Sequence, residues 1–146
     1  MAIKTLTAAN SVYLLAIADL YPVAQKLEGY ATDDAFSVED IAPAEVVKGV
    51  DGKMSGAFLP TVSPQTIVLQ ADSPSIDIFE NWLSAQKAAR EIMYASATIL
   101  LPAVGKKYAC SKGVLTKATQ HAGVKKTLGS QTYQITWDDI SPAAVL

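Results

Sequence analysis

Apolar and polar residues alternate along several short stretches, which is the period-two pattern of strands with one buried face. The alternation is clearest at 131–137, where tyrosine, isoleucine and tryptophan are separated by polar residues. Residues 66–70 are apolar on both faces, which favours a central strand. Pro22 is expected to end the first strand, with pairing resuming at 23–30. The pattern predicts strands at 11–20, 35–41, 66–70, 97–104, 107–110, 113–119 and 131–137.

A β-hairpin is predicted at about 45–59. Two valines lead into Asp51 and Gly52, and the apolar stretch 54–59 leads out of the turn. The Asp-Gly pair suits a tight turn in which both central residues take positive φ.

One helix is predicted at about 74–93. Ser73 is placed to cap its first turn, and Pro74 stands at the first helical position, where its missing N–H costs nothing. Apolar residues including Ile76 and Phe79 recur at helical spacing and form a broad stripe. Such a helix covers one face or end of a sheet, so the fold class is α+β and mostly β.

The composition suits one folded domain. The chain has 146 residues, of which half are hydrophobic and 18% are charged. The charged fraction is below the usual value of about 25%, which leaves weakly hydrated surface of the kind that partners cover. A domain that is rich in alanine and threonine and has no partner would show a similarly low charged fraction.

Charge is distributed unevenly along the chain. Residues 1–80 contain eleven acids and four lysines, whereas residues 92–137 contain six lysines and no acid. Three interpretations remain open: a solvated face, a basic patch for nucleic acid, or subunits that meet head to tail with opposite charges. A pI near 5.3 disfavours nucleic-acid binding by the whole domain.

The usual catalytic and ligand-binding constellations are absent from the sequence. With a single cysteine and a single histidine, the common zinc sites cannot form, and the spacing of Cys110 and His121 matches no nucleophile signature. Ser84 and Lys87 fit a Ser-x-x-Lys pattern, but the companion motifs are missing. Phosphate-binding glycine loops are absent as well. The sequence therefore predicts a protein that is not an enzyme and takes no cofactor or metal.

Both ends of the sequence are expected to be arms of one domain that spans 1–146. Asp138 and Asp139 are expected to end the last strand, which leaves 140–146 as a C-terminal arm, and 1–10 form an N-terminal arm. No stretch approaches the 18 or so apolar residues that a membrane span needs, so no membrane partner is expected.

Several segments, taken in order, carry a family resemblance. They are the hairpin Val50-Asp51-Gly52-Lys53-Met54, the stretch 68–75 that leads into a helix with Phe79, Trp82 and Leu83, and the strands at 113–116 and 131–137. This arrangement resembles the small structural proteins that form the tail tube of contractile-tailed bacteriophages. The likeness runs from about Ser11 to Asp139.

The resemblance implies a single tail-tube domain, built as a β barrel or sandwich with one flanking α-helix and the hairpin at about 45–59 protruding. It also implies homo-hexameric rings that stack into a hollow tube, with the tail sheath, baseplate and tape-measure proteins as partners. DNA would pass through the lumen during ejection without specific binding. The protein would reside in the phage tail of the virion after assembly in the host cytoplasm.

Contacts between subunits are expected at the hairpin, the basic segment and one aromatic residue. The candidates are Val50, Asp51, Gly52, Lys53, Met54, Lys106, Lys107, Lys112 and Trp137. A channel for DNA is better lined by acidic or neutral groups, because lysines would slow its passage. We therefore expect the lysines of 106–126 to lie mainly away from the lumen.

Two alternatives remain. A tube subunit of a related contractile injection system, such as a secretion system or bacteriocin, would share the fold. A monomeric β-rich binding module would instead stay single at high concentration and offer a preformed pocket.

Overall fold

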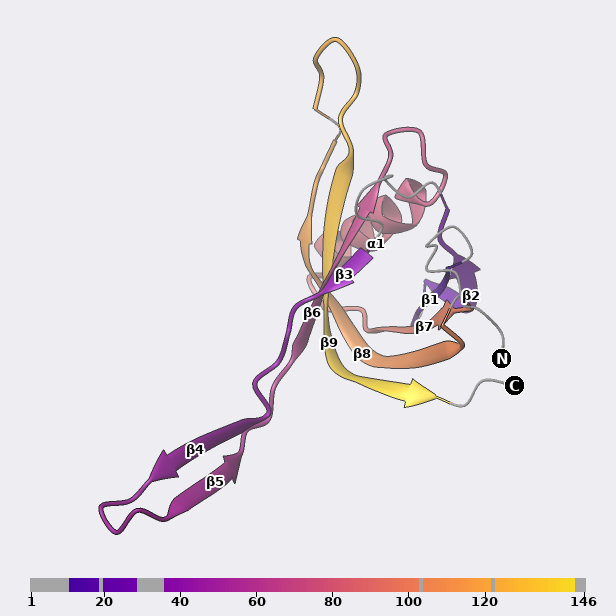
Figure 1. Cartoon of the computed structure of the whole chain (residues 1–146). Helices are drawn as coiled ribbons and strands as arrows, with labels where there is room; N and C mark the ends of the chain where they lie inside the picture. The colour runs from indigo at the N-terminus through magenta and orange to yellow at the C-terminus, as the bar shows by residue number, and fades with distance from the viewer. Residues whose placement is uncertain (1–10, 19, 29–35, 103, 122, 144–146) are drawn as a thin grey trace.

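The computed structural model describes residues 11–18, 20–28, 36–102, 104–121 and 123–143; the expected N-terminal arm at 1–10 lies outside them. The elements follow one another along the chain as shown in Figure 1. They are β1 (Val12–Ile17), β2 (Tyr21–Lys26), β3 (Phe36–Val38), β4 (Ala44–Lys48), β5 (Met54–Phe58), β6 (Ser63–Leu69), α1 (Ile76–Ala89), β7 (Ala95–Leu101), β8 (Lys106–Ala118) and β9 (Gln131–Ala143).

Most strands belong to one antiparallel sheet with the order β2-β1-β7-β8-β9-β6-β3, while β4 and β5 pair only with each other. No ladder among the described residues joins the edge strands β2 and β3, so the sheet stays open and does not close into a barrel. It curls until β1 faces β3 and β6: the rings of Tyr13 and Phe36 lie 5.3 Å apart, and the Tyr13 hydroxyl donates to Gln65 Oε1 at 2.7 Å. The predicted mostly β fold is confirmed as a sandwich-like sheet with one helix.

The expected strand break at Pro22 is wrong, because Pro22 lies inside β2. β2 is an edge strand, with a ladder partner on one side only. Proline is tolerated on an edge strand because the missing N–H need not serve a second ladder.

The two longest strands, β8 and β9, correct two further expectations. Residues 107–110 and 113–119 do not form two strands but one, β8, which bulges against β7 near Lys112. β9 does not end at Asp138 and Asp139, as expected, but pairs with β8 as far as Ala143. The expected arm at 140–146 is therefore strand up to Ala143, because the long β8 supplies a backbone ladder alongside it.

The hydrophobic core lies inside the curled sheet and beneath α1. Phe79 of α1 stacks on Tyr133 of β9 with ring centroids 4.3 Å apart, and the Trp82 indole donates a hydrogen bond to the Met93 carbonyl at 3.0 Å. Trp82 and Trp137 are both fully buried. The helix covers the sheet as its apolar stripe predicts.

The helix begins later than the sequence indicates. Its first residue is Ile76 and its N-cap is Ser75, so Ser73 and Pro74 lie before the helix. The two serine hydroxyls bond to the backbone of Glu28: Ser73 Oγ donates to its carbonyl, and Ser75 Oγ accepts from its N–H at 2.7 Å. Ser73 was predicted to be the N-cap, a position that Ser75 takes. The Ser73 hydroxyl accepts from the Ser75 N–H at 3.2 Å, just before the helix, and also ties this segment to Glu28, which follows β2.

Candidate assembly surfaces

The β4–β5 hairpin, residues 44–58, extends away from the rest of the chain (Figure 1). Every residue of both strands is exposed. At its base, the Leu59 N–H donates to the Pro43 carbonyl at 2.8 Å, which holds the two connecting segments side by side. The predicted hairpin is thus confirmed, and its residues are uncovered in a single chain.

The turn of the hairpin differs from the predicted Asp-Gly turn. The Gly52 N–H donates to the Gly49 carbonyl at 2.9 Å, so the turn spans 49–52. Gly52 takes a φ of 82°, whereas Asp51 does not have positive φ. The Asp51 carboxylate instead accepts from the Lys53 N–H at 3.1 Å, which fixes the tip through a side chain.

The two faces of the hairpin differ in polarity. The cross-strand partners Ala44 with Phe58, Val46 with Gly56, and Lys48 with Met54 share one face, since paired residues point the same way. The other face carries Glu45 with Ala57 and Val47 with Ser55. Phe58 is 81% exposed and Met54 is 72% exposed, so the first face is an uncovered apolar surface. We call it the hairpin apolar face.

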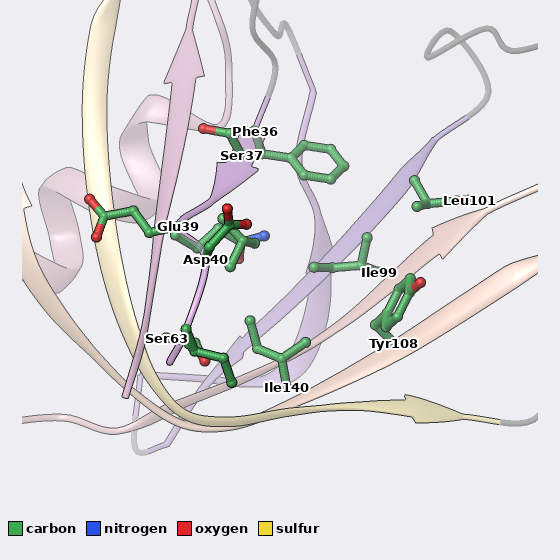
Figure 2. A pocket seen from close by; sticks show the side chains of 12 residues that line it. Phe36, Ser37, Glu39, Asp40, Ser63, Ile99, Leu101, Tyr108 and Ile140 are labelled. Carbon is green, nitrogen blue, oxygen red and sulfur yellow. The ribbon is translucent and has the colours of Figure 1, made fainter. Parts of the chain in front are cut away.

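A pocket of about 460 Å³ lies where the curled sheet brings β3 opposite β7, β8 and β9. Apolar side chains line much of it: Phe36, Ile99, Leu101, Tyr108 and Ile140. In Figure 2, Ile99, Tyr108 and Ile140 border one space, while the Glu39 carboxylate points away from it. Asp40 lines the side of the pocket formed by the segment after β3. We call this the β3 pocket.

Gln65 lines the β3 pocket and is fully buried. Its Oε1 accepts from both the Tyr13 hydroxyl and the Trp137 indole N–H, at 2.7 and 2.9 Å. Because the indole can only donate, these bonds fix the orientation of the amide. Gln65 Nε2 is left as the buried side-chain polar atom without a partner among the described residues.

The remaining sequence candidates are spread over the molecule. Lys106 and Lys107 begin β8, and Lys112 lies at the bulge with its Nζ 5.3 Å from the centroid of the Tyr94 ring of the same chain. Trp137 is fully buried and is a core residue of the single chain, so its indole offers no surface to a neighbour. The candidates at 50–54 all lie at or beside the tip of the hairpin. The other candidates belong to β8 and β9, which follow much later in the chain.

The residues that the sequence analysis considered as nucleophiles do not form a reactive site among the described residues. Burial, with a smaller effect of the Asp139 charge, raises the pKa of the Cys110 thiol to about 12, which opposes formation of a nucleophilic thiolate. Ser84 and Lys87 lie on exposed positions of α1. Among the residues described, no group of three metal-ligating side chains comes together, and no helix is long and apolar enough to cross a membrane.

Sequence reasoning missed Val46 and Phe58 as members of one face, and it missed the β3 pocket. The predicted Asp-Gly turn hid this face, because it would pair Val50 with Lys53 and hence Val46 with Ala57. The observed register is shifted by one residue and pairs Val46 with Gly56, which places Phe58 on the same face as Val46. The pocket was not predictable, because it depends on how far the sheet curls.

A family model described as Tail fiber protein gp32 matches residues 4–141. The chain belongs to this family. No curated protein matches the sequence of this gp32-family member.

Solved structures with a similar fold come from contractile injection particles. The sheath/tube terminator of PVC, an extracellular contractile injection system, superposes with a TM-score of 0.67 at 13% identity, covering 98% of this chain and 100% of that one. The baseplate structure of the anti-feeding prophage gives 0.58 at 10% identity, with 99% of each chain covered. The cap that terminates the anti-feeding prophage tube gives 0.56 at 9% identity, with 99% and 95% covered. At these identities the likeness establishes the fold of the gp32-family chain.

Proposed function

We propose that this protein is a non-enzymatic structural subunit of a phage tail or related contractile particle, and that it assembles with copies of itself through the β4–β5 hairpin. The observation that carries the proposal is the hairpin apolar face, whose strand residues are all exposed and which packs on none of the described residues outside the hairpin. A two-stranded hairpin is only marginally stable in water unless something covers it. Exposed contiguous apolar surface of this kind marks a protein interface.

The finer proposal is a tube subunit. Six copies form a ring, rings stack into a hollow tube through which DNA passes, and the sheath, baseplate and tape-measure proteins are its neighbours in the virion. The particles named for the structural neighbours and the family description support a place in such an assembly. Heterologous contacts that do not close along an axis generate a stack of this kind.

A matched pair of variants tests the role of the hairpin. Val46 and Val47 are both 61% exposed, but they lie on opposite faces. We expect Val46→Ser together with Phe58→Ser to abolish rings or tubes in negative-stain microscopy, and Val47→Ser together with Ala57→Ser on the opposite face to leave them intact. A wild-type protein that remains monomeric at high concentration in light scattering would overturn the proposal and favour a binding module.

A second candidate is a terminator or cap, which two of the structural neighbours favour. A tube subunit offers complementary contacts at both ends and polymerises, whereas a terminator stops at one ring. Purified protein that gives tubes of variable length supports the tube subunit. Single rings of constant height, which grow no further at high concentration, support the terminator.

A further inference from the structure

Two surfaces of this chain are apolar and uncovered, and their side chains are of a kind that would pack against each other. The hairpin apolar face exposes Val46, Met54 and Phe58 at one end of the molecule. The β3 pocket is lined largely by apolar side chains, and Gln65, whose Nε2 has no partner among the described residues, is one of the residues that line it. Neither surface is covered by the other in the same chain, since every strand residue of the hairpin is exposed.

We propose that the β3 pocket receives the β4–β5 hairpin of a second copy of this chain. The inference rests on the proposed function and names the surface against which the hairpin assembles. The hairpin apolar face covers Phe36, Leu101 and Ile140, which are half-buried in the single chain, and so removes apolar area of both copies from water.

The backbone of both surfaces suits this docking. β3 is an edge strand of the large sheet and also lines the pocket, and the two-stranded β4–β5 sheet has an unpaired outer side on each strand. An edge strand with unpaired N–H and C=O groups accepts a further strand from another chain. A hairpin laid along β3 therefore extends the sheet while its side chains reach the pocket.

Opposite charges on the two surfaces would orient the hairpin within the β3 pocket. Lys48 lies on the hairpin apolar face beside Met54, near the tip. Asp40 lines the pocket, with Glu39 next to it on the outer side. A lysine at the far end of an apolar face and a carboxylate at the border of an apolar pocket fix the orientation of the docked hairpin.

The polar bonding of the pocket floor is incomplete in one chain. Gln65 holds Tyr13 and Trp137 through its oxygen, and its amide nitrogen has no acceptor among the described residues. A buried donor without an acceptor is costly. Gln65 is also one of the residues that line the β3 pocket.

Cross-linking between differently tagged copies tests the docking. All proteins carry Cys110→Ala; one carries Met54→Cys in the hairpin, and the other carries Ser37→Cys at the pocket. Ser84→Cys on the exposed side of α1 is the matched control. Under a short bis-maleimide, we expect a hairpin-to-pocket product in the assembled fraction and at least about ten-fold less product with the Ser84→Cys control.

A charge exchange tests the orientation. We expect Lys48→Glu to lower the yield of cross-linked product by up to about five-fold, the scale of an exposed ion pair. Asp40→Lys in the other copy should restore the yield, whereas Lys87→Glu on α1 should not change it.

The outcomes separate the docking from the proposed function. Assemblies that form without a hairpin-to-pocket product, or that cross-link equally at Ser84→Cys, overturn the docking and leave self-assembly standing. A product found only within one chain carrying both Met54→Cys and Ser37→Cys means that the hairpin folds back on its own pocket, which also overturns the docking. Monomers alone under all conditions overturn both.

Discussion

Gly113 determines how closely β8 approaches the core residue Trp137. A Cβ at this position would lie 2.4 Å from Trp137 Cζ3 and 2.9 Å from Ile135 Cγ2. Both neighbours are fully buried and cannot swing away into solvent. The glycine is thus required for the close packing of β8 against these two side chains.

We expect Gly113→Ala to lower the free energy of unfolding by about 3 kcal/mol through overpacking. Gly123→Ala is the control, because a Cβ there meets nothing within 4 Å. Urea unfolding of the two variants measures the difference. Equal stability of the two variants would show that the core around Trp137 adapts easily.

Two buried acids make the fold sensitive to alkaline pH. Burial raises the pKa of Cys110 from 9.0 to about 12, and burial with the Glu80 charge raises the pKa of Tyr133 from 10.0 to about 12. Both groups ionise more easily in the unfolded chain, so their stabilising contribution is complete below pH 9 and is lost as pH rises toward 12. We expect the urea concentration at the midpoint of unfolding to be lower at pH 10.5 than at pH 8. Cys110→Ala should reduce this fall, and a midpoint independent of pH would contradict the assignment.

At the scale of elements, the strand pattern was predictable where one face is buried. The alternation at 131–137 gives the buried residues of β9 correctly, with Tyr133, Ile135 and Trp137 inside. The extension of β9 to Ala143 was not predictable, because it depends on the ladder that β8 provides, whereas Asp138 and Asp139 by themselves indicate the end of a strand. The helix start was misplaced for a similar reason: Ser73 binds the distant Glu28 backbone. The end of β9 and the start of α1 both depend on segments that are distant in the sequence, and local patterns do not reveal such segments.

The hairpin behaves as a separate element. We expect deletion of 44–58, with Pro43 and Leu59 joined by a short Gly-Ser linker, to change the stability of the domain by less than about 0.5 kcal/mol. The reason is that the two ends already lie together, with the Leu59 N–H bonded to the Pro43 carbonyl. Thermal unfolding of the monomer followed by circular dichroism checks this. A large loss of stability would mean that the hairpin supports its own domain.

At the scale of the whole molecule, the uneven charge along the sequence does not collect into one patch. Lys106 and Lys107 begin β8, whereas Lys125 and Lys126 lie between β8 and β9 beyond its other end. The sequence predicts the hairpin that carries one of the two candidate surfaces. It does not predict the other, the β3 pocket, because that pocket arises from the curl of the entire sheet. The proposed assembly arm was therefore predictable, and the proposed receiving surface was not.

We expect the lysines between 106 and 126 to lie mainly on outer or subunit-contact surfaces in an assembled ring. A lysine-rich wall would bind the phosphate backbone and hold DNA in the channel. A cryo-EM map of the assembled protein checks their positions. A lumen lined by most of these lysines would refute the expectation.

The narrow base of the hairpin at Pro43 and Leu59 has an evolutionary consequence. The strands of the proposed arm, within 44–58, are exposed and contribute no residue to the core on which folding depends. The arm can therefore diversify and acquire a new binding preference, while the body that carries it keeps its shape.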